Sequence, residues 1–391
     1  MTMQDLTLAS GLAGELLIDV ATNEVAGPVK GSVKTLIERL EFSASEHVLP
    51  PGLFSGLAGI DYSINEGLKA LQVPKDKRIS YHEEVVAFYL TYLDTESARL
   101  EYDIISGLAG IGLWACTLDD EISGAKIAGK ILDALNETKR NLSSDMYAWE
   151  TPVRREIISG KKQRENQDDY NLGLAHGLPG ILLFISLAYG KGLLNNKKLA
   201  SDLVGGILHF LCDQANKQSR NNVGIFGHST YNMDISRMAW CYGDPGVAVA
   251  IAVTNEYLPS EISKKLIVRL ADSMSKREFM ESGCIDGGIC HGTTGVFLIL
   301  KWLRMLNESY ISSTCVAAWA EYLNLRESHD WYKPSRLIWE MNVGDWVNAP
   351  GYLNGVDGIL AVQAINSTNK QWNWSIARPL GLFDLAEKAD V

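Results

Sequence analysis

Stretches with few polar residues follow each of seven glycine pairs along the chain. Examples are residues 181–188 and 296–303, which are apolar nearly all round, whereas segments such as 126–140 and 260–280 are charged and more amphipathic. A helix that is apolar on every side must be enclosed by other elements, while an amphipathic helix can face solvent. The pattern therefore predicts inner helices that alternate with outer helices.

The glycine pair has the form Gly-x-x-Gly, and its first glycines are spaced by 45 to 70 residues. Each interval is long enough for two helices and their connections. We therefore predict an all-α fold with about seven inner and seven outer helices, either closed into an α/α toroid or left as an open superhelix. The seven pairs are Gly11/Gly14, Gly56/Gly59, Gly107/Gly110, Gly177/Gly180, Gly243/Gly246, Gly292/Gly295 and Gly355/Gly358.

Two segments interrupt the pattern. Residues 141–171 are polar and rich in turn formers, which indicates an inserted loop or a short β element. Residues 328–354 hold a cluster of aromatic side chains that either packs in the core or walls a peptide cleft. Because the repeats run along nearly the whole chain, we predict one domain over 1–391, with the polar insertion at 141–171 inside it.

Composition and charge narrow the class of protein. Of 391 residues, 46% are hydrophobic and 21% are charged, which is typical of a soluble globular protein with a large core. The net charge of −11 speaks against nucleic acid and anionic membrane surfaces as partners. The most apolar segment, 172–190, contains His176 and Pro179, so we expect a buried helix and no membrane insertion. Six cysteines and no visible secretory signal predict a reduced, cytoplasmic protein.

Metal-binding side chains occupy matching positions in neighbouring repeats. Cys241 and Cys290 both stand two residues before a first glycine, and His291 stands one residue before its glycine. In a closed ring these equivalent positions would converge near the axis. Two thiolates and an imidazole suit zinc, and three protein ligands leave one coordination position open for chemistry. We therefore predict a zinc ion held by these three residues.

Other polar residues near the motifs are candidates for catalysis. His176 stands one residue before its first glycine, as His291 does, and its repeat directly precedes the repeat of Cys241. Its ordinary pKa suits proton transfer near neutral pH, although a fourth metal ligand or a buried core histidine is the alternative. Asp103 precedes its glycine by four residues, a position from which it would orient His176. Arg237, with Asp234, either lies at the site or forms a structural ion pair. We interpret the remaining cysteines as structural; among them Cys284 is the one plausible extra ligand.

Three motifs resemble the lanthionine synthetase C-like family. They are Gly-Leu-Ala-His-Gly at 173–177, Trp-Cys-Tyr-Gly-x-Pro-Gly at 240–246 and Cys-His-Gly-Thr-x-Gly at 290–295. The resemblance extends over essentially the whole chain. The tyrosine at position 242 is typical of the free-standing bacterial cyclases of that family.

The resemblance implies an α/α toroid with a single zinc that cyclises a dehydrated precursor peptide. Cysteine thiols would add to dehydroalanine or dehydrobutyrine and form lanthionine or methyllanthionine rings. By motif match, the zinc ligands would be Cys241, Cys290 and His291, and the catalytic surround would be His176, Asp103, Arg237 and Tyr242.

The resemblance also implies partners. The chain lacks the large dehydratase or kinase regions of the multifunctional members, so a separate dehydratase would prepare the leader-bearing precursor, and an export transporter would complete a complex at the membrane periphery. Two other functions fit the same metal ligands: a noncatalytic zinc-binding adaptor for peptides or a partner enzyme, and the addition of glutathione to dehydroamino acids. A zinc prenyltransferase is disfavoured, because its ligands are Asp, Cys and His.

Overall fold

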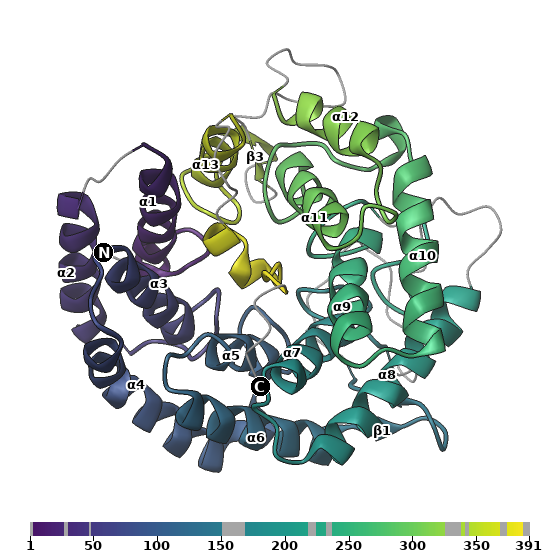
Figure 1. The fold of residues 1–391 in the computed structure, drawn as a ribbon, viewed down its shortest axis with the longest axis horizontal. Helices are drawn as coiled ribbons and strands as arrows, with labels where there is room; N and C mark the ends of the chain where they lie inside the picture. The colour runs from purple at the N-terminus through teal and green to yellow at the C-terminus, as the bar shows by residue number, and fades with distance from the viewer. Residues whose placement is uncertain are drawn as a thin grey trace.

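The structure is a computed structural model, and its helices form an inner and an outer ring (Figure 1). It describes residues 3–26, 30–46, 48–150, 169–217, 224–231, 237–324, 338–340, 344–367 and 374–385. The inner helices are α1 (Leu12–Ala26), α3 (Leu57–Ala70), α5 (Leu108–Ala115), α7 (Leu178–Gly190), α9 (Asp244–Tyr257), α11 (Thr293–Leu306) and α13 (Val356–Asn366). The outer helices are α2 (Lys30–Ser45), α4 (Lys75–Glu96), α6 (Glu121–Thr138), α8 (Lys197–Lys217), α10 (Glu261–Lys276) and α12 (Ser313–Leu323). The predicted alternation of inner and outer helices is confirmed.

Backbone hydrogen bonds close the inner ring. The residue two positions before a first glycine donates its N–H to the carbonyl of the equivalent residue in the next repeat, and between the third and fourth repeats the neighbouring Ile104 donates instead. Leu353 of the last repeat donates to Ala9 of the first at 2.8 Å, and α1 packs against α13. The fold is therefore a closed α/α toroid and not an open superhelix. The donor and acceptor pairs are Ala9–Phe54, Phe54–Ile105, Ile104–Ala175, Ala175–Cys241, Cys241–Cys290, Cys290–Leu353 and Leu353–Ala9.

The glycine pair has a steric purpose. Every inner helix begins at the residue after a first glycine. A Cβ atom on the second glycine would collide with a carbonyl oxygen six residues earlier, at 1.9 Å for both Gly59 and Gly295. At Gly243 the first glycine also has φ of 92°, a conformation that other residues rarely adopt. Glycine thus lets each loop fold tightly over the start of its helix.

The sequence predicted a seventh outer helix after the last inner helix. Instead, the C-terminal segment lies in the middle of the ring (Figure 1). The described part after α13 forms two short 3₁₀ helices, η4 (Trp374–Ile376) and η5 (Arg378–Leu380), and most of its side chains are buried. Buried tyrosine and tryptophan side chains of the ring donate hydrogen bonds to carbonyls of this segment, which gives its buried polar backbone the partners that it requires. These hydrogen bonds are Tyr62 to Ser375 (3.0 Å), Trp240 to Leu380 (2.9 Å), Trp302 to Phe383 (2.8 Å) and Tyr352 to Ile376.

Short strands accompany the helices, as predicted. β1 (Arg140–Asn141) pairs antiparallel with β2 (Tyr147–Ala148) at the start of the 141–171 insertion, of which 151–168 lies outside the described residues. β3 (Ile338–Glu340) pairs antiparallel with β4 (Asp345–Val347). Three further 3₁₀ helices are η1 (Met3–Leu6), η2 (Ser97–Arg99) and η3 (Phe279–Glu281). None of the described helices has the length and apolarity that a bilayer crossing needs.

The aromatic cluster predicted over 328–354 is divided between core and surface. Tyr352 is fully buried, while Trp339 and Trp346 are half-buried on the β3–β4 hairpin with ring centroids 4.5 Å apart. Trp331 and Tyr332 lie outside the described residues. Of the described members of the cluster, Tyr352 therefore packs in the core, and the hairpin carries a separate tryptophan pair.

Candidate metal centre

Three potential metal ligands meet where the loops before α9 and α11 lie side by side. The Sγ atoms of Cys241 and Cys290 and a ring nitrogen of His291 lie within 4.8 Å of one another. The N–H of Cys241 donates to the Cys290 carbonyl at 3.1 Å, as part of the hydrogen-bonded ring described above. The backbone of the toroid thus brings two cysteines from neighbouring repeats together and holds them in register.

Asp286 orients His291. One oxygen of its fully buried carboxylate, Oδ2, lies 3.5 Å from Nε2 of His291. The same carboxylate accepts the N–H of Gly288 at 2.9 Å and that of Trp339 at 3.2 Å. With Nε2 facing a carboxylate, Nδ1 is the nitrogen left to bind a metal, an arrangement common among metal-binding histidines. Sequence reasoning overlooked Asp286, although it is the one charged residue between Cys284 and Cys290.

Hydrogen bonds within the group of Cys241, Cys290 and His291, the metal-ligand trio, shift the pKa values of all three side chains. The hydrogen bond from Cys290 holds the pKa of the Cys241 thiol well below its usual range, against the opposing effect of burial, and His291 and Arg237 lower it further. The same hydrogen bond, together with burial, raises the pKa of Cys290. Burial lowers the pKa of His291, but the bonds to Asp286 and Cys241 outweigh it and raise the value to about 9. Two cysteine sulfurs, of which Cys241 has thiolate character, and one imidazole are a donor set that fits zinc.

His176 and Asp103 form a hydrogen-bonded pair, as the sequence predicted. Nδ1 of His176 lies 2.5 Å from Oδ2 of the buried Asp103, whose Oδ1 accepts the N–H of Ser106 at 2.8 Å. The His176 side chain is 45% exposed. Burial lowers the pKa of His176, but the hydrogen bond and charge of Asp103 outweigh it, so the pKa is raised. With Nδ1 bound to Asp103 and the side chain partly exposed, Nε2 is the ring nitrogen that a substrate could reach.

Tyr242 has two histidine rings in its neighbourhood. Its ring centroid is 6.3 Å from that of His176 and 4.7 Å from that of His228. Its hydroxyl accepts a hydrogen bond from Nδ2 of Asn171 at 3.1 Å. Burial raises the pKa of Tyr242, and the bond from Asn171 offsets part of that effect. Sequence reasoning overlooked both neighbours: Asn171 stands two residues before the motif at 173–177, and His228 belongs to no glycine motif.

Arg237 lies within electrostatic reach of the trio. It is half-buried, and its charge lowers the pKa values of Cys241 and Cys290. Its suggested partner Asp234 lies outside the described residues. Cys284 is separate from the trio: it is buried, its Sγ donates to the Met238 carbonyl at 3.2 Å, and burial raises its pKa to about 12. These properties agree with a structural cysteine.

Comparison with known proteins identifies the family. A family model described as lanthionine synthetase C-like protein matches residues 2–376. The chain belongs to this family. A curated member, nisin biosynthesis protein NisC of Lactococcus lactis subsp. lactis, is 26% identical over 384 residues, which cover 92% of this chain and 84% of that protein. A solved structure of nisin cyclase matches 98% of this chain and 94% of its own, with a TM-score of 0.67 at 21% identity, and shares the toroid fold.

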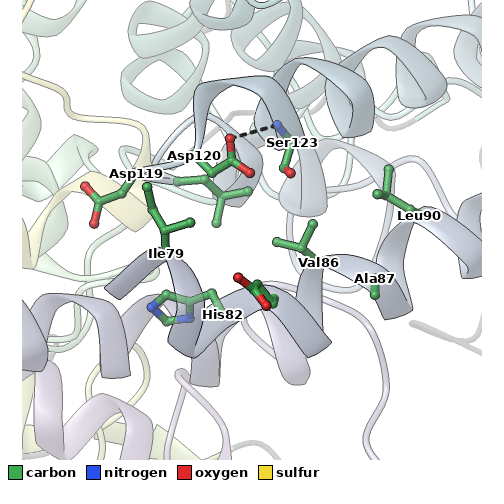
Figure 2. A pocket seen from close by; sticks show the side chains of 10 residues that line it. Ile79, His82, Val86, Ala87, Leu90, Asp119, Asp120 and Ser123 are labelled. Carbon is green, nitrogen blue, oxygen red and sulfur yellow. Dashed lines mark hydrogen bonds between the residues drawn. The ribbon is translucent and has the colours of Figure 1, made fainter. Parts of the chain in front are cut away.

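This lanthionine synthetase C-like protein also has a cavity of about 130 Å³ between α4 and the start of α6 (Figure 2). Its walls are mainly apolar, and Figure 2 shows Asp120 bonded to the backbone of Ser123. Asp120 caps α6 by this bond, and Asp119 is paired with Arg78 at 2.7 Å. Because these acidic groups are already engaged in structural contacts, the metal centre is the better candidate for chemistry.

Proposed function

We propose that this protein is a zinc-dependent lanthipeptide cyclase. It would add cysteine thiols to dehydroalanine or dehydrobutyrine within one dehydrated precursor peptide and so form lanthionine or methyllanthionine rings. Family membership supports this function, as does the nisin cyclase likeness. The observation that carries it is a Cys-Cys-His group within 4.8 Å, built into the same hydrogen-bonded ring of loops as a His–Asp pair.

Cys241, Cys290 and His291 would hold the metal, with Asp286 fixing the orientation of His291. Zinc bound there would deprotonate a substrate cysteine and position its sulfur at the open coordination site. Two thiolate ligands limit the positive charge that the substrate sulfur meets, so that sulfur stays nucleophilic. Arg237 supports the same group, because its charge stabilises the thiolate forms of both cysteines.

The remaining residues handle the proton. The substrate thiolate forms a carbon–sulfur bond at the β-carbon, and the electron pair of the double bond moves toward the carbonyl oxygen. The α-carbon of the resulting enolate must then take up one proton, which balances the proton that the thiol lost. His176 would deliver it from Nε2, while Asp103 binds Nδ1 at 2.5 Å and fixes the ring. Arg237 and Tyr242 would stabilise the enolate charge.

This function requires partners. The substrate is a dehydrated precursor peptide with its leader, and a separate dehydratase would supply it. An export transporter would remove the cyclised product. The proposed setting is the cytoplasm, with the protein at the membrane edge only through such a complex.

The decisive test uses zinc-loaded protein and a dehydrated peptide with one cysteine and one dehydroalanine. After incubation, free thiols are alkylated and the peptide mass is measured. Cyclisation leaves the peptide mass unchanged and consumes the thiol, so we expect a product without the alkyl group. Complete alkylation with the wild-type protein would contradict the proposal, and a mass increased by glutathione, when that thiol is added, would favour the alternative reaction.

Two cysteine variants serve as matched controls. Cys290→Ala removes a metal ligand and is expected to lose both bound zinc and cyclisation. Cys284→Ala removes a cysteine six residues earlier that is also buried but stands apart from the trio. It should keep one zinc per chain and most of its activity. Zinc content measured by elemental analysis separates the two variants independently of activity.

A further inference from the structure

The orientation of the Asn171 side chain is fixed by an unambiguous donor. The backbone N–H of Gly173 can only donate, and it lies 2.9 Å from one end of the Asn171 amide, which must therefore be the oxygen Oδ1. The other end is Nδ2, which can only donate. Nδ2 lies 3.1 Å from the hydroxyl of Tyr242, so the phenol oxygen accepts this hydrogen bond.

The phenol ring is held as firmly as its oxygen. A Cβ atom on Gly173 would lie 2.4 Å from Cδ1 of Tyr242, so the ring packs directly on the Gly173 backbone. The ring of His228 lies 4.7 Å away, between centroids. The segment from Asn171 to Gly173 thus places the ring and also binds its hydroxyl oxygen.

The phenolic proton is left for another acceptor. Tyr242 is half-buried, and among the described residues its hydrogen-bond partner is Asn171, which is a donor. The ring stands 6.3 Å from that of His176, between centroids, on the side of the site where the proton would be delivered. A hydroxyl whose oxygen already accepts a bond, and whose own proton is uncommitted, is prepared to donate to a substrate.

We infer that Asn171 is a positioning residue that makes Tyr242 a hydrogen-bond donor to the substrate carbonyl whose oxygen gains negative charge during thiol addition. This inference rests on the proposed cyclase function. A preorganised donor stabilises developing negative charge without reorganising during the reaction. Asn171 itself touches no reacting atom and acts through Tyr242.

The test exchanges the donor at position 171 for an acceptor. In Asn171→Asp, the carboxylate still accepts the Gly173 N–H but would also accept the phenolic proton, which removes that proton from the substrate. We expect kcat for cyclisation to fall by about 10²-fold, as when one donor to a developing oxyanion is lost, with KM within about threefold of wild type. Asn171→Ala, which leaves the phenolic proton uncommitted, should lose less than the Asp variant.

Tyr242→Phe provides the matched background. Without a phenol hydroxyl, Asp and Ala at position 171 should give the same kcat within about twofold, because neither can act through Tyr242. A large difference that persists in this background would show that the Asp charge acts by another route and would overturn the inference. So would a wild-type kcat in Asn171→Asp with full zinc content.

A spectroscopic measurement decides the matter without activity. The paired Raman bands of a tyrosine ring change in relative intensity according to whether the hydroxyl accepts or donates a hydrogen bond. The difference spectrum between wild type and Tyr242→Phe should show an accepting phenol, and the same difference in the Asn171→Asp background a donating one. An unchanged difference spectrum would overturn the inference.

If the Asp variant does not fold, loss of the accepting signature in Asn171→Ala is the corresponding test. Absence of cyclisation by wild type would refute the proposed function but leave this measurement valid.

Discussion

Among the described residues, two histidine–aspartate pairs share the same short contact between Nδ1 and a carboxylate but have different surroundings. Nδ1 of His176 lies 2.5 Å from Asp103, and Nδ1 of His82 lies 2.5 Å from Asp61. The His176 side chain is 45% exposed on a loop before an inner helix, whereas that of His82 is 5% exposed on the outer helix α4. Hydrogen-bond geometry alone therefore does not distinguish a reactive pair from a structural one.

The two pairs differ in the contacts of the second carboxylate oxygen and the second imidazole nitrogen, which take no part in the His–Asp hydrogen bond. The other oxygen of Asp61 accepts the indole N–H of Trp114 at 2.8 Å, so the buried pair joins α3, α4 and α5. Nε2 of His82 is buried and has no hydrogen-bond partner among the described residues. The other oxygen of Asp103 instead accepts the N–H of Ser106 in its own loop, and Nε2 is the second ring nitrogen of the partly exposed His176. A pair can transfer protons to a substrate only where its second nitrogen can be reached.

The largest expected effect is a difference in kcat between variants that each lack one of the two histidines. His176→Asn should reduce kcat for cyclisation by about 10³-fold, within the range for loss of a general acid or base, because the variant lacks the proposed proton donor. Its zinc content should equal that of wild type. His82→Asn should leave kcat of the folded, zinc-loaded protein within about twofold of wild type. Single-turnover cyclisation and zinc analysis measure both effects.

The opposite pattern would break the comparison. Zinc loss in His176→Asn as complete as in Cys290→Ala would make His176 a metal ligand and not a proton donor. Equal losses of kcat in the two histidine variants would mean that the buried pair also controls the chemistry. Either result would remove the distinction drawn from exposure.

The second effect concerns stability, where the order of the two pairs should reverse. Asp61→Ala leaves the Trp114 indole and the His82 imidazole without their buried acceptor, which should cost about 3 kcal/mol of unfolding free energy. Asp103→Ala lies in a loop beside a partly exposed histidine and should cost about 1 kcal/mol. Urea unfolding of the zinc-loaded variants measures both values. A larger loss in Asp103→Ala than in Asp61→Ala would contradict the structural role assigned to the buried pair.

The difference between the pairs also shows what sequence can predict. Each Gly-x-x-Gly fixes the backbone locally in the same way, so the positions just before it are equivalent in every repeat. Aligning them was enough to predict that Cys241, Cys290 and His291 converge and that His176 lies at the equivalent point one repeat earlier. The structure brings these residues together through the closed ring of loops.

Contacts between side chains on separate helices and loops could not be predicted from the spacing of residues in the sequence. Asp61 and His82 lie within helices, and the local sequence pattern does not indicate that α3 and α4 bring them together. Asp286 and Asn171 support site residues through side-chain geometry that spacing does not encode. The C-terminal segment around Leu380 fills the centre because indole and phenol donors from distant repeats bind its carbonyls. The repeated glycine motif was sufficient to predict the ring of helices. The residues that support the site are identified only by tertiary contacts.

The smallest expected effect is the pH dependence that the exposed pair gives to stability. The folded pKa of His176 is raised, so folding binds a proton there more tightly than the unfolded chain does. This stabilisation is complete below the unfolded pKa of about 6.5 and is lost as pH rises through the folded pKa. It should remain below about 1 kcal/mol, because the side chain is 45% exposed and solvent screens the pair.

This contribution of His176 is measured as the difference in unfolding free energy between zinc-loaded His82→Asn protein with and without the additional His176→Asn substitution. The stabilising difference should shrink as pH rises above the unfolded pKa, and Asp103→Asn should flatten the profile. A difference that grows with pH would show that Asp103 does not stabilise the charged imidazole, and the proton would then have to be supplied in another way.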